Sequence, residues 1–269
     1  MGYYADLPGV RTWYEAEGDR DPLVLLHGSF CTNDTWDAQL AELTAAGYHA
    51  FLPERRAHGH TPDVAGPLTY QDMADDTVAF LETVVGGPAH LVGWSNGGII
   101  ALLVAAARPD LVREVVAIGA DFRPRSECFA APGMLDEMTP DSADLQFFRE
   151  LYESVTPDGP DHWPVVAAKM TDMWRTEPTL TTQDPVRVVA PTLVLVGDDD
   201  LMTPEHTTAL YRAIPESRLA VVPGASHLVP LEQPDLVNRL ILEHLAQDAV
   251  ETMMPVRRAA TAGADAHTR

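Results

Sequence analysis

Short, almost continuously apolar stretches alternate with longer amphipathic ones along most of this chain. The short stretches are typical of strands that are covered on both faces of a sheet. The longer stretches carry apolar residues at helical spacing, and each connects strands that would then run parallel. The pattern predicts strands over residues 11–15, 23–26, 49–53, 89–94, 115–119, 192–196 and 219–222, and helices over 72–85, 96–108, 204–213 and 235–248.

One interval, residues 122–183, interrupts this alternation. It contains no convincing strand, but helical spacing recurs over 140–155 and again over 163–176. Thr139 followed by Pro140 is a favourable start for the first of these helices. Because the strand series resumes afterwards, we interpret the interval as a helical cap, or lid, inserted into one domain.

The domain interpretation follows from that insertion. Residues 1–121 and 184–250 would together form an α/β core with a mostly parallel central sheet flanked by helices. Residues 251–269 are rich in Ala and polar residues and show no apolar period, which predicts a mobile C-terminal tail.

Charge narrows the classes of partner. The 269 residues include 40 Asp and Glu against 18 Lys and Arg, a net charge of −22. Such a surface repels nucleic acid and acidic lipid, so we expect neither a nucleic-acid nor a membrane partner. It also disfavours a strongly anionic substrate, unless a local cluster such as Arg55 and Arg56 reverses the field within one cleft. The first residues show no secretory signal pattern, and the longest apolar run, 99–107, is too short to span a bilayer. We therefore expect a cytoplasmic protein. We expect it to be a monomer or a homodimer.

The strongest chemical signal is a serine between a strand and a helix. Gly93, Ser95 and Gly97 form a Gly-x-Ser-x-Gly pattern directly after the strand over 89–94. A sharp strand-to-helix turn strains the serine backbone, and small residues two positions away avoid collision. We therefore predict that Ser95 is a nucleophile and that the Asn96 amide is half of an oxyanion hole.

A serine nucleophile needs a base and an orienting acid. His27, His58, His60 and His206 compete by position, but chain order favours His227, which follows the last predicted strand. Three adjacent aspartates follow the strand over 192–196. The spacing Gly-x-x-Asp-x-x-x-Pro favours Asp200 as the acid, while Asp198 and Asp199 remain alternatives; a calcium loop is disfavoured because the expected ligand spacing is absent.

The second oxyanion donor is expected where the strand over 23–26 runs into a glycine turn. The Ser29 amide is the first choice for this donor, with Phe30 as the alternative. We expect His27 to order this loop rather than to react.

These segments together resemble the serine hydrolases of the α/β-hydrolase fold over nearly the whole chain. The motifs, in family order, are VLLHG at 24–28, PERRAHGHT at 53–61, GWSNGG at 93–98, GDDDLMTP at 197–204 and GASH at 224–227. The resemblance implies a triad of Ser95, Asp200 and His227 with Ser29 and Asn96 as oxyanion donors, and no cofactor or metal. Relatives that open epoxides or remove halide carry Asp at the nucleophile position, so Ser95 disfavours those activities.

The second motif departs slightly from the family. Glu54, Ala57 and Thr61 stand where relatives usually show Asp, Gly and Ser. The segment orders the sheet edge in the family, so no catalytic assignment depends on these positions. Relatives that cleave carbon–carbon bonds commonly have a glycine-proline-glycine signature after the His-Gly pair, which this chain lacks.

The function predicted is hydrolysis of a small-molecule carboxylic ester, lactone or thioester through an acyl-enzyme on Ser95. Acyl transfer, perhydrolysis and cofactor-free oxygen chemistry use nearly the same residues, and a slow ligand sensor with a mobile cap is an alternative of another class. An apolar ester is the provisional substrate, since apolar side chains are available to line a pocket. The candidates are Phe30, Trp94, Met134, Met138, Phe148, Met170 and Trp174.

Overall fold

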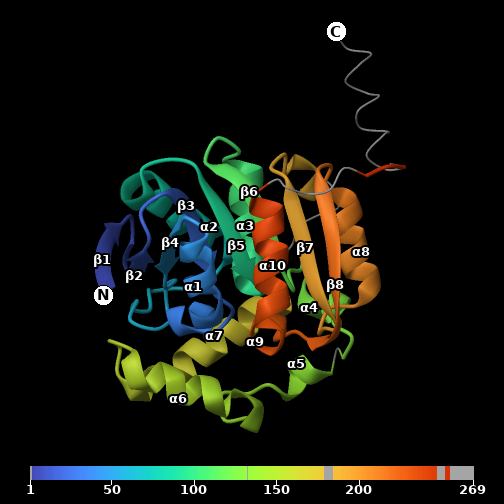
Figure 1. The fold of residues 1–269 in the computed structure, drawn as a ribbon. Helices are drawn as coiled ribbons and strands as arrows, with labels where there is room; N and C mark the ends of the chain where they lie inside the picture. Colours follow the sequence, from blue (N-terminus) through green and yellow to red (C-terminus); the bar gives the residue numbers. More distant parts are fainter. Residues whose placement is uncertain (1, 132, 179–183, 247–251, 255–269) are drawn as a thin grey trace.

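The computed structural model describes residues 2–131, 133–178, 184–246 and 252–254. Its centre is an eight-stranded sheet with the spatial order β1-β2-β4-β3-β5-β6-β7-β8 (Figure 1). The pairs from β4 onward in this order are parallel, whereas β2 pairs antiparallel with both β1 and β4. The strands are β1 Gly2–Leu7, β2 Val10–Glu17, β3 Asp21–Leu26, β4 Tyr48–Pro53, β5 Ala89–Trp94, β6 Val112–Ile118, β7 Thr192–Asp199 and β8 Ser217–Ser226.

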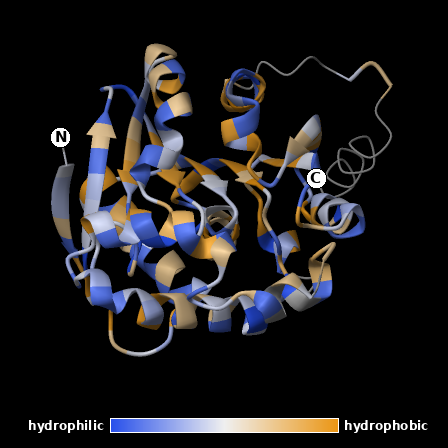
Figure 2. Cartoon of the chain, turned by 90° about the horizontal axis from the view of Figure 1, so that it is seen from below, coloured by the Kyte–Doolittle hydropathy of each residue, from blue (hydrophilic) through white to orange (hydrophobic). Residues whose placement is uncertain are grey.

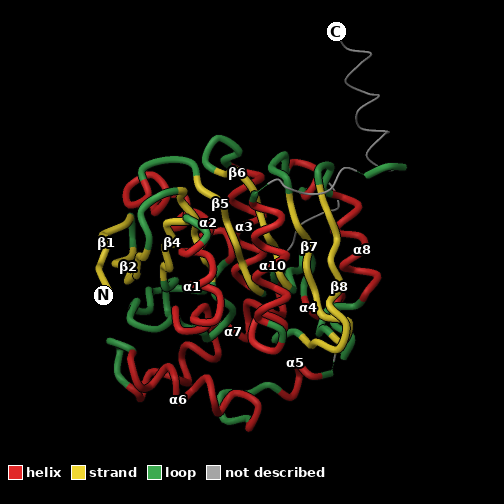
Figure 3. The backbone as a smooth tube through the Cα atoms, viewed as in Figure 1, coloured by secondary structure: helices red, strands yellow, loops and turns green. Residues whose placement is uncertain are grey.

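Helices cover both faces of this sheet, as the tube drawing shows (Figure 3). Consecutive side chains of a strand point to opposite faces: Leu23 and Leu25 of β3 pack with α1, α9 and α10, while Val24 and Leu26 pack with α2, α3 and α8. The two cores that result explain why the central strands are continuously apolar. The flanking helices are α1 Asp37–Ala45, α2 Tyr70–Phe80, α3 Asn96–Ala107, α8 Pro204–Ala213, α9 Val229–Glu232 and α10 Pro234–Leu245.

The described residues of the chain between β6 and β7, the inserted segment, form helices joined by turns, with one isolated bridge from Phe129 to Met202. The inserted segment crosses the end of the molecule at which β5, β7 and β8 finish (Figure 1), and Figure 2 views the molecule from this side. Its α-helices are α4 Arg125–Cys128, α5 Met134–Glu137, α6 Gln146–Val155 and α7 Trp163–Thr176.

One predicted helix start in this segment is wrong. The helix expected over 140–155 begins at Gln146, after a turn and a short 3-10 helix over Ala143–Leu145. Ser142 closes the turn by donating from its amide and hydroxyl to the Thr139 carbonyl, and the Trp163 indole donates to the Pro140 carbonyl at 2.8 Å. A local turn therefore occupies the Thr139 carbonyl and a tertiary contact occupies the Pro140 carbonyl, both of which the predicted helix would have used.

Two further differences between the predicted and the observed elements lie in the first 45 residues. The sequence pattern missed β1, an exposed edge strand with weak alternation, and it missed α1. The expected α/β class with a mostly parallel sheet is confirmed. The tail predicted over 251–269 falls almost entirely outside the described residues. Within the ranges given above, every helix is too short or too polar to traverse a bilayer.

Candidate active site

Ser95 occupies the sharp turn between β5 and α3. Its backbone angles are φ +55° and ψ −121°, a conformation that costs a non-glycine residue on the order of 1–3 kcal/mol. A Cβ on Gly93 would lie 2.2 Å from the Gly97 carbonyl oxygen, and one on Gly97 would lie 2.0 Å from the Leu26 carbonyl oxygen. Both glycines are therefore required for α3 to pass this close to β5 and β3.

The turn brings the predicted nucleophile, base and acid into one row. His227 Nε2 lies 3.0 Å from Ser95 Oγ, and His227 Nδ1 lies 2.9 Å from Asp200 Oδ1. The Asp200 side chain is 2% exposed and that of His227 is 13% exposed, so the row is shielded from most water. The Met202 amide also donates to Asp200 Oδ1, at 3.1 Å. A carboxylate placed in this way favours the tautomer in which Nδ1 carries the proton and Nε2 faces the hydroxyl.

The other two aspartates after β7 have different surroundings. Asp198 Oδ1 accepts hydrogen bonds from the amides of Gly224 (2.7 Å) and Ala225 (3.3 Å), and so ties the end of β7 to β8. Asp199 is exposed at the rim of the cavity described below. Of the three alternatives, Asp200 is the one that contacts His227.

The end of β6 makes room for the imidazole. Gly119 follows this strand with φ +54°, and a Cβ there would lie 2.8 Å from His227 Cε1 and 2.9 Å from Nδ1. The Trp94 indole fixes the same loop by donating to the His227 carbonyl at 2.8 Å. Sequence reasoning assigned no role to Gly119, although a glycine directly after an apolar strand was the available signal.

The predicted oxyanion donors lie beside Ser95. Ser29 lines the same cavity as Ser95, and its hydroxyl accepts from the Trp174 indole at 3.2 Å. Phe30, the alternative donor, has φ +59° in the same tight loop. Asn96 is the first residue of α3, where backbone N–H groups lack helical partners and can bind an anion.

His27 is fully buried beneath this loop. The Arg55 amide donates to His27 Nε2 at 3.3 Å, which leaves Nδ1–H to donate to the Gly28 carbonyl at 2.8 Å. Arg55 Nη2 donates to the same carbonyl at 2.9 Å. Burial is the main cause that holds the pKa of His27 well below its usual value, so the imidazole is neutral. These contacts fix the carbonyl that precedes Ser29.

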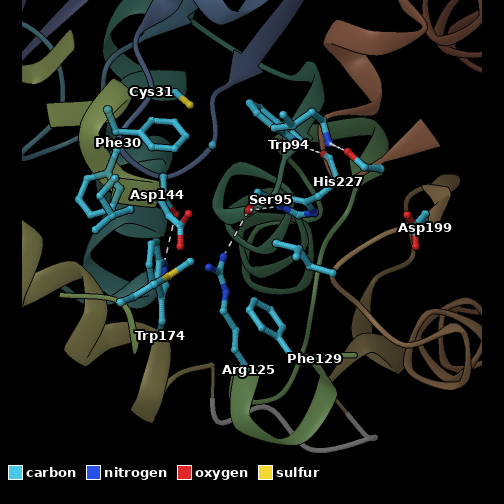
Figure 4. A pocket seen from close by; sticks show the side chains of 18 residues that line it. Phe30, Cys31, Trp94, Ser95, Arg125, Phe129, Asp144, Trp174, Asp199 and His227 are labelled. Carbon is cyan, nitrogen blue, oxygen red and sulfur yellow. Dashed lines mark hydrogen bonds between the residues drawn. The ribbon is translucent and has the colours of Figure 1, made fainter. Parts of the chain in front are cut away.

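A cavity of about 260 Å³ opens above Ser95 (Figure 4). Its floor comes from the ends of β5, β7 and β8 and the loop after β3, and its other walls come from the inserted segment. Most of the lining is apolar, as in sites for small organic molecules. Of the predicted pocket residues, Phe30, Trp94, Met138, Phe148 and Trp174 line the cavity.

Two predicted pocket residues lie elsewhere. Met170 is completely buried, and its sulfur accepts from the Asn96 side chain at 3.5 Å. Met134 belongs to α5 and is not among the described residues that line the cavity. Met170 therefore packs α7 against α3.

Sequence reasoning missed two buried charged residues at the base of the inserted segment. Arg125 lines the cavity, and its Nη2 donates to Ser95 Oγ at 3.2 Å and to Asn96 Oδ1 at 2.8 Å. Asp121 Oδ2 lies 3.5 Å from Arg125 Nε. Burial raises the pKa of Asp121 to about 6, although the Arg125 charge opposes that rise. The available signal was an Asp and an Arg four residues apart, directly after a buried strand.

Metal chemistry has no candidate cluster in the part of the chain that the structure describes. Groups of three or more His, Cys, Asp or Glu side chains able to hold one ion do not occur among these residues. The described side chains that contact Ser95 Oγ are those of His227 and Arg125.

Comparison with known proteins places the chain in a family. A family model described as the alpha/beta hydrolase family matches residues 23–240. The chain belongs to the alpha/beta hydrolase family. The resemblance carried by the sequence motifs is thereby confirmed, and the relatives of this alpha/beta hydrolase include several hydrolases and an esterase with perhydrolase activity.

Three similar proteins illustrate the range of this family. The bifunctional esterase/perhydrolase DCH of Acinetobacter calcoaceticus is 26% identical, over 90% of this chain and 98% of its own length. The (E)-2-((N-methylformamido)methylene)succinate hydrolase of Acinetobacter baylyi is 28% identical, over 84% of this chain and 90% of its own length. A solved thermophilic esterase from Thermogutta terrifontis, with malate bound, is 26% identical at a TM-score of 0.71 and covers 92% of this alpha/beta hydrolase and 98% of its own chain.

Proposed function

We propose that this protein is a serine hydrolase that cleaves a carboxylic ester of a small molecule through an acyl-enzyme on Ser95. The observation that carries the proposal is the continuous row from Ser95 Oγ to His227 Nε2 (3.0 Å) and from His227 Nδ1 to Asp200 Oδ1 (2.9 Å). The row lies at the floor of a cavity large enough for a small ester. Lactones and thioesters present the same carbonyl chemistry and belong to the same proposal.

The first half of the reaction forms the acyl-enzyme. His227 Nε2 removes the Ser95 proton as Oγ attacks the carbonyl carbon, and Asp200 stabilises the imidazolium that forms. The amides of Ser29 and Asn96 bind the negative oxygen. His227 then gives its proton to the leaving alcohol oxygen, so the bond to that oxygen breaks as the alcohol departs.

The second half restores the enzyme. His227 removes a proton from water, the hydroxide attacks the acyl carbon, and Ser95 regains its proton as the carboxylic acid leaves. In this proposal the inserted segment acts as a cap that limits how much water reaches the cavity. The name of the Acinetobacter calcoaceticus relative supports a second outcome, in which hydrogen peroxide replaces water and the product is a peracid.

The test is turnover together with trapping of the nucleophile. Replacing Ser95 by Ala removes the attacking oxygen, so ester turnover should fall about 10⁴-fold or more, measured as alcohol released. An organophosphonate should add to intact wild-type protein, detected by mass, and leave Ser95→Ala unmodified.

Ser154→Ala is the matched control, because Ser154 is an exposed residue of α6 whose hydroxyl donates to its own helix. This variant should match the wild type in both measurements. Ester turnover by Ser95→Ala at a rate near that of Ser154→Ala would overturn the proposal. A single slow turnover by the wild type would favour the ligand sensor.

A further inference from the structure

Arg125 is a buried cation directed at the nucleophile. Its side chain is 5% exposed, and the Trp174 and Phe129 rings lie 4.6 and 5.3 Å from its guanidinium carbon. In Figure 4 the guanidinium approaches Ser95 from one side and His227 approaches from the other. Removing a cation from water costs several kcal/mol unless an anion compensates it, so this placement needs an explanation.

The neighbouring carboxylate compensates this charge only in part. Asp121 is 3.5 Å away, but neither of its carboxylate oxygens, nor Arg125 Nε, has a hydrogen-bond partner within the described residues. In a well-formed buried ion pair, two guanidinium N–H groups would donate to the two carboxylate oxygens at a shorter N···O distance. Asp144 and Asp199 also line the cavity, but both are exposed, so water weakens their field at Arg125.

The two arginines that the sequence suggested as a local positive cluster are engaged elsewhere. Arg55 lies under the oxyanion loop and donates to the Gly28 carbonyl. Arg56 forms two hydrogen bonds of 2.7 Å to the Asp76 carboxylate. Neither lines the cavity, so the positive charge beside Ser95 comes from Arg125.

We propose that Arg125 binds a carboxylate on the acyl part of the substrate, so that the enzyme prefers half-esters of short dicarboxylic acids to neutral esters. This inference rests on the proposed ester hydrolysis. The leaving oxygen must face His227 Nε2 to be protonated, which leaves the acyl group to extend toward the side from which Arg125 approaches. An arginine fork matches a carboxylate in shape and charge.

The distances limit the length of that acyl group. Arg125 Nη2 is 3.2 Å from Ser95 Oγ. A reacting carbon about 3 Å from Oγ and a carboxylate oxygen about 2.8 Å from the guanidinium then lie close together. Two or three bonds between the two carbonyl carbons satisfy both contacts, as in half-esters of malonate and succinate. In this arrangement the substrate carboxylate takes the place of Ser95 Oγ as the partner of Arg125 Nη2. Ser95 Oγ is then free to attack the ester.

The experiment compares two esters of the same shape and different charge. Monomethyl succinate carries the carboxylate, and methyl succinamate carries a neutral amide in its place. The measured quantity is the ratio of kcat/KM for the two esters, from methanol release. We expect the wild type to favour the half-ester at least 10-fold, and Arg125→Gln to lower the ratio at least 10-fold, to a value near one. Arg125→Lys should give a ratio between those of Arg125→Gln and the wild type, because lysine keeps the positive charge but lacks the planar guanidinium that binds both carboxylate oxygens.

The matched control is Arg123→Gln, which removes the same charge two residues away. Arg123 is 41% exposed, pairs with Glu127 and does not line the cavity, so the ratio should stay within about twofold of the wild type. An equal loss for both esters in Arg125→Gln would show a structural role and overturn the inference. A wild type that hydrolyses methyl succinamate as well as the half-ester would also overturn it, while leaving ester hydrolysis intact.

Failure to hydrolyse either ester would overturn the inference, and absence of turnover on other neutral esters as well would remove the proposed function itself. If circular dichroism shows that Arg125→Gln does not fold, inhibition of the wild type by succinate and by succinamide tests the inference instead. Succinate should inhibit hydrolysis of a neutral ester at a concentration at least 10-fold below that of succinamide. Equal inhibition by the two compounds would overturn the inference.

Discussion

The cavity has two halves that are built differently. Ser95, Asp200 and His227 stand at the ends of β5, β7 and β8, where the backbone is held by the sheet. Arg125 and Phe148 come from the inserted segment, whose helices rest on that sheet end. The proposed reaction depends on the first half, and the proposed choice of substrate depends on the second.

The difference is visible in how each half is anchored. The Ser95 amide donates to the Ile118 carbonyl at 2.7 Å, and its carbonyl accepts from the amides of Gly98 and Ile99. In the inserted segment, α6 is strongly amphipathic and Phe147 is 69% exposed beside the partly buried Phe148. Substitutions in the sheet half should therefore alter the rate of chemistry, whereas those in the inserted half should alter substrate preference.

The largest effect that separates the halves is expected from Asp200→Asn. The change leaves shape intact but favours the tautomer in which His227 cannot accept the Ser95 proton, so kcat should fall about 10³ to 10⁴-fold. The change in KM should be small, because no wall of the cavity is altered. Steady-state kinetics on one neutral ester measures both.

Asp198→Asn is the control, since the asparagine oxygen can still accept from the Gly224 amide. Its kcat should remain within about threefold of the wild type. If Asp198→Asn lost as much activity as Asp200→Asn, the assignment of the acid from the contact with His227 would be contradicted.

An intermediate effect is expected on stability in acid. Burial lowers the pKa of His58 to about 3 and those of His206 and His244 to about 4, and all three lie outside the inserted segment. Between pH 6.5 and 4 the unfolded chain binds protons that the folded chain does not, so stability falls as the pH falls. Each histidine should contribute a loss of about 2 kcal/mol between pH 7.5 and pH 5.

Urea unfolding followed by circular dichroism at the two pH values measures this loss. His206→Gln should shrink the difference by about 1–2 kcal/mol, because it removes one group that must stay neutral in the fold. A difference unchanged by the substitution would contradict the burial argument for this residue.

The smallest effect is expected from Phe148→Ala in the inserted half. Removing this ring from the cavity wall should lower kcat/KM about 10-fold for apolar acyl esters, mainly through KM. Phe147→Ala is the matched control on the same helix, and its exposed ring should leave kcat/KM within twofold. A fall in kcat alone for Phe148→Ala would mean that the two halves are not separable.

The sequence predicted the sheet half well for a physical reason. The strand β5, the turn at Ser95 and the start of α3 are consecutive in the chain, so local spacing carries their geometry. The choice of Asp200 among three adjacent aspartates was less secure, because neighbouring positions at a strand end differ in direction rather than in sequence pattern.

The inserted half was predicted less well. The start of α6 was wrong because the Trp163 indole binds a carbonyl 23 residues earlier, a contact that helical spacing does not record. Arg125 was missed because a single arginine in a short helix has no periodicity, and its importance arises from its distance to Ser95.

The sequence by itself determined that this chain forms an open α/β sheet with a serine at a strained turn, since both features depend on residues close together in the chain. Only the tertiary structure decided which aspartate meets His227 and which arginine faces the cavity. Those contacts join residues 27 and 30 positions apart, and their geometry depends on how the whole sheet and the inserted helices pack.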